Sequence, residues 1–333
     1  MDKEKQKLLN IIDNFHQKRI IVWGDFILDE YIYGDTRRIS REAPVLILSY
    51  HSKKLSLGGA GNSVLNLLSL GAEPLPVGVI GSDDSGKKIL KIFQQKKIST
   101  EYLHSEKKYQ TPIKTRILAG EGHTRKQQIL RIDRETKVPE DTEIKQKIKQ
   151  NIKKIFKSSQ AMLISDYNYL TIKVETFDQV LPWFKKANIP VTLDSRFRLL
   201  SFKGVTVATP NEPEVEEALR TKINEDTAIL KNAGRHILKK IQSPALLITR
   251  GSKGMILFEE RKTPFSIPIH GTTDIVDVTG AGDTVISVFT LAIACGATFR
   301  QAALLANYAG SVVVMKKGTA ILAPLELKKA ITS

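Results

Sequence analysis

Short apolar, β-rich runs alternate with helical segments along most of the chain, and this alternation is the feature that most restricts its fold. Strands separated by helices pair in parallel, because the chain needs a crossover to return in the same direction. The predicted strands are 19–25, 75–81, 161–167, 189–194, 205–210 and 245–251, and the predicted helices are 59–71, 83–96, 139–156, 171–187, 224–241, 280–296 and 298–315. The sequence therefore predicts a doubly wound α/β core.

Two stretches, 31–54 and 108–133, break this rhythm. Both contain alternating, β-branched segments without a helix between them, which is typical of a small β-sheet. We call this predicted sheet the lid. The chain of 333 residues has no internal repeat and no long Gly/Ser linker. We therefore expect one domain, 1–333, from which the two lid stretches project.

The motif DVTGAGD, residues 277–283, precedes an apolar helical stretch. The amides of Gly280, Ala281 and Gly282 are expected to form an anion hole, because N–H groups in the first turn lack helical partners and the helix dipole favours negative charge. Asp283 is placed to accept the proton of a hydroxyl while the hole stabilises a phosphoryl group in transfer. A helix cap beside a glycine turn is the structural alternative for the same residues.

A second glycine cluster, LGGAGN at 57–62, precedes the first long predicted helix. Gly58 and Gly59 permit close backbone approach, and the amide of Asn62 both donates and accepts, which suits sugar hydroxyls. Asp25 and Asp29 lie at and just after the end of the first predicted strand, where α/β sheets place ligand-binding groups. Capping of the following turn is the alternative for these two carboxylates.

Two familiar nucleotide-binding patterns are absent or incomplete. The glycine clusters do not fit the dinucleotide fingerprint, since Val285 stands where a glycine is required, and this disfavours a Rossmann dehydrogenase. The stretch GSDDSGKK, 81–88, nearly fits the phosphate loop of P-loop enzymes. However, Lys88 replaces the Ser or Thr that would hold Mg²⁺, and Asp83 and Asp84 put negative charge where phosphates would bind. We interpret it as a loop that opens a helix.

Two further segments suit a nucleotide and its metal. In TPNEPE, 209–214, Asn211 and Glu214 lie three residues apart and could bind a hydrated Mg²⁺ from one helix face, although an Asn cap explains the same pattern. In TRGSKG, 249–254, a strand, a turn and a second strand could pass under a nucleotide, and a plain β-turn explains it equally well.

Charge and composition exclude other classes of function. The formal net charge is +16, but the lysines are scattered, and runs such as 145–157 have the spacing of a solvated helix face. We therefore expect an anionic small substrate and no nucleic acid. The N-terminus lacks the apolar core of a signal peptide, and no window is apolar enough to span a bilayer, so we expect a cytoplasmic protein without membrane contact. The single cysteine, Cys295, is expected to be structural.

Taken in order, the early Gly-Asp, GGAGN, TPNEPE, TRGSKG and DVTGAGD resemble the ribokinase (PfkB) family of carbohydrate kinases, over residues 17–330. The resemblance implies an αβα sandwich with a mostly parallel central sheet and a β lid. It implies that Asp283 is the catalytic base and that Gly280, Ala281 and Gly282 form the anion hole. The resemblance further implies cofactor sites: Asn211 and Glu214 for Mg²⁺ and phosphate, Thr249, Arg250, Gly251 and Gly254 for ATP, and Asp277 and Thr279 for a monovalent cation such as K⁺.

A narrower resemblance rests on GDFILDEY (24–31), RISREAPV (38–45), QQILRID (127–133) and SDY (165–167). These segments are similar to the kinase domain of the bacterial heptose-7-phosphate kinases. The resemblance implies phosphorylation at O1 of D-glycero-β-D-manno-heptose 7-phosphate, on the route to ADP-heptose for lipopolysaccharide. Asp166 would then bind the substrate, and the substrate's phosphate would pair with arginines of this side, from the set Arg38, Arg116, Arg131 and Arg196; a solvated surface position is the alternative for each.

The chain departs from that family at two places on the expected substrate side. Asn168-Tyr169-Leu170 replaces a Lys-Gly pair, and Asp194-Ser195-Arg196 replaces Asp-Pro-Lys. We also expect a separate nucleotidyltransferase as pathway partner and a homodimer formed through the exposed strand edges of the lid. Another sugar or sugar-phosphate kinase of the same fold, and a non-catalytic binding relative, remain alternatives.

Overall fold

The computed structural model describes residues 3–120, 126–224, 226–271 and 275–333. Parts of the predicted lid, 121–125, and of a predicted helix, 225, lie outside the described residues. The helices are α1 (Lys3–Asp13), α2 (Ala60–Ser69), α3 (Asp84–Gln95), α4 (Thr142–Ile155), α5 (Val174–Lys186), α6 (Glu212–Leu219), α7 (Thr227–Lys240), α8 (Ala281–Ala294), α9 (Phe299–Val313) and α10 (Pro324–Thr332).

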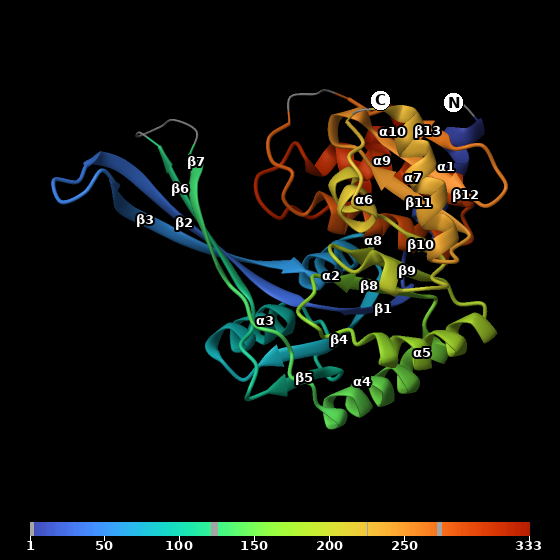
Figure 1. The fold of residues 1–333 in the computed structure, drawn as a ribbon, viewed down its shortest axis with the longest axis horizontal. Coiled ribbons are helices and arrows are strands. Elements are labelled where there is room, and N and C mark those ends of the chain that lie inside the picture. Colours follow the sequence, from blue (N-terminus) through green and yellow to red (C-terminus); the bar gives the residue numbers. More distant parts are fainter. Residues whose placement is uncertain (1–2, 121–125, 225, 272–274) are drawn as a thin grey trace.

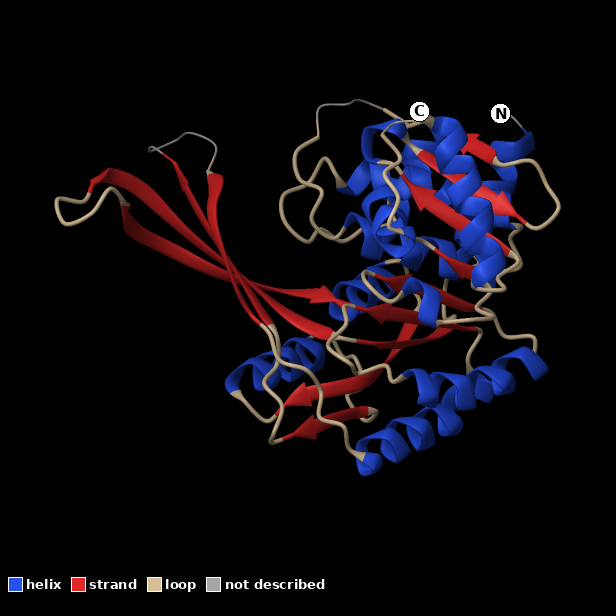
Figure 2. Cartoon of the chain, in the orientation of Figure 1, coloured by secondary structure: helices blue, strands red, loops and turns tan. Residues whose placement is uncertain are grey.

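The strands form two sheets, drawn in red in Figure 2. The nine-stranded sheet has the order β13-β12-β11-β10-β9-β8-β1-β4-β5, and the four-stranded sheet has the order β3-β2-β6-β7. The strands are β1 (Arg19–Gly24), β2 (Phe26–Ile39), β3 (Leu46–Gly59), β4 (Glu73–Gly81), β5 (Leu103–Glu106), β6 (Ile113–Gly120), β7 (Gln127–Arg134), β8 (Ala161–Asp166), β9 (Val191–Ser195), β10 (Val207–Ala208), β11 (Ala245–Thr249), β12 (Met255–Glu259) and β13 (Phe265–Ile267).

The large sheet is parallel except at one edge, where β12 and β13 pair in antiparallel fashion. Its strands are apolar on both faces, so helices cover both. In β1, Ile20 and Val22 pack with residues of α1, α2, α8, α9 and α10, whereas Ile21 and Trp23 point to the opposite face and pack with residues of α4, α5 and α7. Figure 1 shows these layers, and the predicted αβα sandwich is confirmed.

The small sheet is the predicted lid, and its strands project from the body as a long arm (Figure 1). It consists of two hairpins, β2–β3 and β6–β7, joined by a parallel pairing of β2 with β6. The strands are longer than the sequence indicates, because β2 begins at Phe26 and β3 ends at Gly59. Both hairpins therefore start at the body, and the lid bases lie beside the carboxyl ends of β1 and β8.

The near match to a phosphate loop at 81–88 is a structural turn, as predicted. The Asp83 carboxylate caps α3 by accepting the Gly86 amide at 2.8 Å, and it also accepts the amide and hydroxyl of Thr111 at 2.9 Å each. A side chain at Gly86 would place its Cβ 2.0 Å from the Gly81 carbonyl oxygen, so close packing explains this glycine. No helix of the described residues is long and apolar enough to cross a membrane.

Candidate active site

The loop before α8 brings Asp283 to the carboxyl edge of the large sheet. Gly280 caps the helix in the left-handed region, with a φ of 77°, and a Cβ there would lie 2.4 Å from Asn62 Nδ2. Asp283 is the third residue of the helix and only 3% exposed, so the capping alternative for its side chain does not hold. One part of the predicted anion hole needs correction: the Ala281 amide donates to the Val278 carbonyl at 3.2 Å, which leaves the amides of Gly280 and Gly282 as candidates.

Both oxygens of the Asp283 carboxylate are held by side chains from other elements. Asn62 of α2 donates its Nδ2 to Oδ2 at 2.9 Å and to the Gly280 carbonyl at 3.3 Å. The Tyr167 hydroxyl, just after β8, donates to Oδ1 at 3.1 Å. Burial raises the pKa of Asp283 to about 7, although both hydrogen bonds act to lower it. Asp283 is therefore a fixed carboxylate whose pKa suits proton acceptance near neutral pH.

Gly58 and Gly59 of the GGAGN cluster are required by close contacts with Asp29 and Asp25. A Cβ at Gly58 would lie 2.5 Å from Asp29 Oδ2, and one at Gly59, whose φ is 55°, would lie 2.7 Å from the Asp25 carbonyl oxygen. Asp29 is buried and forms an ion pair with Arg116 of β6. Burial raises the pKa of Asp29, and the Arg116 charge opposes that rise.

These groups share one cavity of about 310 Å³. Its lining joins the lid bases to the start of α8 and consists of Ile27, Asp29, Gly58, Gly59, Lys114, Arg116, Arg131, Tyr167, Arg196, Val278, Thr279, Gly280, Asp283 and Thr319. The structure thus brings most of the predicted catalytic and substrate residues together. Sequence reasoning missed Lys114, Tyr167 and Thr319. Tyr167 lies in the quoted SDY segment, whereas Lys114 had no local signal, since only the register of the lid places it here.

Arg38 does not join them. It pairs with Ile47 near the far end of β2 and is exposed. It lies nine positions along β2 from Asp29, which is about 30 Å at ~3.3 Å per residue. The structure therefore does not bring Arg38, predicted to bind the substrate, to this cavity, because 38–45 forms the outer part of the lid hairpin.

Asp25 and Asp166 lie behind the cavity wall and are absent from its lining. The Asp25 carboxylate accepts the amides of Tyr167, Tyr169 and Thr171 at 2.8, 3.0 and 3.2 Å. Burial and the neighbouring Asp166 raise its pKa to about 6. Asp166 in turn pairs with Arg198. In place of the predicted substrate contacts, these two carboxylates fix the loop that carries Tyr167.

The candidate metal residues also have structural partners. Asn211 and Glu214 cap α6 reciprocally: the Asn211 side chain accepts the Glu214 amide at 2.9 Å, and Glu214 accepts the Asn211 amide at 2.8 Å. Burial raises the pKa of Glu214 to about 7, and burial together with the Glu214 charge raises that of Asp194. Asp194 was missed as a site residue; its Oδ2 lies 4.0 Å from where a Cβ on Gly282 would be.

Within the described ranges, no group of three or more acidic, His or Cys side chains is arranged to hold a metal ion. Two nearby carboxylates fit Mg²⁺, which keeps several waters and takes few protein ligands when phosphates supply the rest. Asp277, predicted for K⁺, accepts the amides of Thr279 and Gly318 at 2.9 Å each, and these bonds hold its pKa below the usual range. The K⁺ site remains a prediction.

The predicted nucleotide segment forms the expected strand, turn and strand. Thr249 ends β11 and bridges to Asn211, so the nucleotide and metal candidates are adjacent. The Arg250 guanidinium pairs with Glu212. Gly251 and Gly254 both have positive φ, 55° and 79°, and a Cβ at Gly254 would lie 2.1 Å from the Ile267 carbonyl oxygen.

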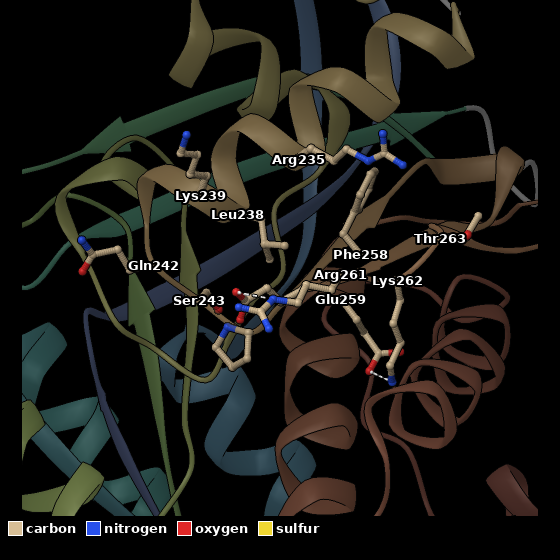
Figure 3. Close-up of a pocket in the computed structure, with 12 residues that line it drawn as sticks. Arg235, Leu238, Lys239, Gln242, Ser243, Phe258, Glu259, Arg261, Lys262 and Thr263 are labelled. Atoms are coloured by element: carbon tan, nitrogen blue, oxygen red, sulfur yellow. Dashed lines mark hydrogen bonds and ion pairs between the residues drawn. The ribbon is translucent and has the colours of Figure 1, made fainter.

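A cavity of about 850 Å³ lies elsewhere, between α7 and the turn that joins β12 to β13 (Figure 3). Leu238 and Phe258 line it together with charged side chains. It is next to Ala245, the first residue of β11, which pairs with Glu259. Ligand sites of parallel α/β sheets lie at the carboxyl ends of the strands, where Thr249 is, so this cavity is at the wrong end for the chemistry.

Comparison with known proteins gives concordant matches. A family model described as "pfkB family carbohydrate kinase" matches residues 17–326. Relatives named bifunctional protein HldE, from Pelobacter propionicus and Citrifermentans bemidjiense, are 34% and 37% identical over 329 and 325 residues. These alignments cover 98% and 97% of this chain, but 66% and 65% of the relatives. The chain thus spans about two thirds of the length of these relatives.

Solved structures show the same fold. Arabidopsis thaliana ribokinase complexed with ribose and ATP matches with a TM-score of 0.72 and 21% identity, over 96% of this chain and 99% of that one. Escherichia coli phosphofructokinase-2 in complex with fructose-6-phosphate matches with a TM-score of 0.74 and 15% identity, over 95% and 98%. The predicted ribokinase-like fold is confirmed.

The raised pKa of Asp283 predicts a stability cost. Its native pKa, about 7, exceeds the unperturbed 3.8, so between these pH values the native state binds more protons than the unfolded state, and stability falls as pH rises. Asp283→Asn should therefore raise the melting temperature, by more at pH 8 than at pH 5. Asp277 is the control, because its pKa is lowered and its charge therefore stabilises the native state. Asp277→Asn should melt at a lower temperature than wild type. Calorimetry at both pH values tests this, and an Asp283→Asn protein less stable than wild type at pH 8 would contradict it.

Proposed function

The chain belongs to the pfkB family of carbohydrate kinases, and from this premise we propose that it transfers the γ-phosphoryl group of ATP to a sugar hydroxyl whose proton passes to Asp283. One observation carries the proposal: the buried carboxylate of Asp283, held by Asn62 and Tyr167, lines a cavity that cationic side chains also line. Phosphoryl transfer needs mainly positioning and charge stabilisation, and this arrangement supplies both.

In this mechanism the hydroxyl donates its proton to Asp283 as its oxygen attacks the γ-phosphorus, and the bond from the γ-phosphorus to the β,γ-bridging oxygen breaks, so that ADP leaves. The amides of Gly280 and Gly282, at the positive end of the α8 dipole, stabilise the charge on the transferred group. Glu214 and Asp194 would hold a hydrated Mg²⁺, which supplies charge neutralisation for the phosphates. Thr249, Gly251 and Gly254 would line the ATP site, and Asp277 and Thr279 remain the candidates for K⁺.

The acceptor we propose is D-glycero-β-D-manno-heptose 7-phosphate, phosphorylated at O1, with a nucleotidyltransferase consuming the product. Support comes from the HldE relatives, which match almost the whole chain, and from the segments at 24–31, 38–45, 127–133 and 165–167. The second candidate is another sugar or sugar phosphate. Its support is the fold shared with Escherichia coli phosphofructokinase-2 in complex with fructose-6-phosphate.

A substrate panel separates these candidates. ADP release with Mg·ATP and K⁺ should be fastest with the heptose 7-phosphate and slower with ribose, fructose and fructose 6-phosphate. Asp283→Asn should lose at least about 10³-fold in kcat while still binding ATP and sugar, because only the proton acceptor is removed. Activity confined to another sugar would move the protein to the second candidate, and substantial turnover by Asp283→Asn would remove Asp283 as the base.

Tyr167 should tune the base. Its hydroxyl bond lowers the pKa of Asp283, so Tyr167→Phe should move the acidic limb of the kcat–pH profile up by as much as about 1 unit, the value of one hydrogen bond. Activity at high pH should be retained. The control is Tyr169→Phe, since the Tyr169 hydroxyl bonds Glu135 and not Asp283. Equal shifts in both variants, or none in either, would show that Tyr167 does not set this pKa.

We also propose a cytoplasmic homodimer formed through the lid. Leu130 and Ile132 of β7 are 52% and 47% exposed, on the lid face opposite to the side chain of Arg131. Leu130→Glu should convert a dimer to monomers in sedimentation velocity, because a charge would have to be buried in the contact. Lys91→Glu on α3, away from the lid, should leave the dimer intact. A wild-type monomer at tens of micromolar protein would contradict the proposal.

A further inference from the structure

A second cavity, of about 470 Å³, opens beside the Asp283 cavity. The two cavities are neighbours, because four residues line both of them: Lys114, Arg131, Tyr167 and Arg196. Three of these four side chains are cationic, which makes the shared wall electropositive. A molecule bound beside Asp283 therefore occupies a cavity that these cations also line.

The register of the lid explains why the cations converge. Between β6 and β7, Lys114 lies opposite Asp133, and Arg116 lies opposite Arg131. Residues directly opposite in paired strands, and residues two apart in one strand, share a face of the sheet. Lys114, Arg116 and Arg131 therefore project from the same face of the lid base, toward the body. Two like charges directly opposite one another are unfavourable unless other charges compensate.

Each arginine of this face has a close carboxylate, but the lysine has none. Arg116 pairs with Asp29, and Arg131 pairs with Asp133 at 2.9 Å. For Lys114 the nearest carboxylate oxygen among the described residues belongs to Glu135, 4.0 Å from Nζ, and Glu135 already accepts the Tyr169 hydroxyl.

The Lys114 side chain is nevertheless only 7% exposed. Its Nζ lies 5.5 Å from the centre of the Tyr167 ring, a cation–π contact that compensates in part. Burial and the charge of Arg196 lower the pKa of Lys114. A buried ammonium without a close acceptor is costly in the empty protein, and an incoming anion would relieve that cost.

We propose that Lys114, assisted by Arg196, binds a phosphate that the acceptor sugar carries away from its reacting hydroxyl, and so selects a sugar phosphate over the neutral sugar. Tyr167 sets the spacing: its hydroxyl bonds Asp283 while its ring lies under Lys114, so the reacting end and the anionic end of the acceptor are one tyrosine side chain apart. Arg116 is held by Asp29 and contributes charge only. This inference rests on the proposed kinase activity of the Asp283 site.

The test compares acceptors with and without their phosphate: the heptose 7-phosphate against the same heptose, and fructose 6-phosphate against fructose. Wild type should prefer the phosphorylated member of a pair. Lys114→Met should lower kcat/KM for the sugar phosphate by about 10- to 100-fold more than for the neutral sugar, the usual value of a charge-assisted hydrogen bond. Lys114→Arg should restore most of the preference.

The matched control is Lys137→Met, which removes an exposed lysine from the rim of the same cavity and should change neither acceptor. Lys114→Met should melt no lower than wild type, because it removes a buried charge that lacks a close partner. Equal losses on both members of a pair, or a wild type without preference, would overturn the inference while the kinase activity stands.

A binding measurement keeps the two proposals separate. Calorimetric titration of the sugar phosphates without ATP should show weaker binding to Lys114→Met than to wild type. If no sugar is turned over, the proposed function fails, and the titration alone decides the inference. Sugar-phosphate binding that Lys114→Met does not weaken, or no binding to wild type, would then refute it.

Discussion

The buried carboxylate of Asp25 is the constraint on which the site depends. Its three hydrogen bonds from the amides of Tyr167, Tyr169 and Thr171 wrap the loop after β8 around the end of β1. Its own amide donates to the Ser165 carbonyl, and its carbonyl accepts the Ala60 amide, so β1, β8 and the start of α2 meet at one residue. Without this junction, neither Tyr167 nor Asn62 would be held against Asp283.

That arrangement gives the site two ends of opposite charge. Glu214 and Asp194 lie at one end, and their pKa values are raised by burial. Lys114 lies at the other end with a lowered pKa, and the charge of Arg196 is felt by both Glu214 and Lys114. The buried charges at each end are unfavourable when no ligand is bound. The ligands proposed for the two ends, Mg²⁺ for the carboxylates and a phosphate for Lys114, carry the opposite charge. The stability that these buried charges cost is thus given up at the residues proposed to bind ligands and to transfer the proton.

The sequence predicted the elements with local signals. Helices predicted from caps and periodicity lie within a few residues of the predicted bounds, and α3 has its Asp83 cap. The DVTGAGD motif predicted that Asp283 lies at a helix start. The terminal helices α1 and α10 and the short strands β5 and β13 were not predicted. Lys114 and Asp194 were missed for another reason: strand register and sheet order, which no local pattern reveals, bring them to the site. Asp25 was recognised as important, but its hydrogen bonds are structural.

In the part of the lid that the structure describes, the two hairpins pair through the parallel strands β2 and β6, and each hairpin begins and ends at the body. Residues inserted in pairs at either hairpin tip would lengthen the arm without changing which side chains face the body at its base. Evolution can therefore vary the length of the arm independently of its base, which carries Asp29 and Lys114. The length of the lid and the side chains at its base can therefore change separately.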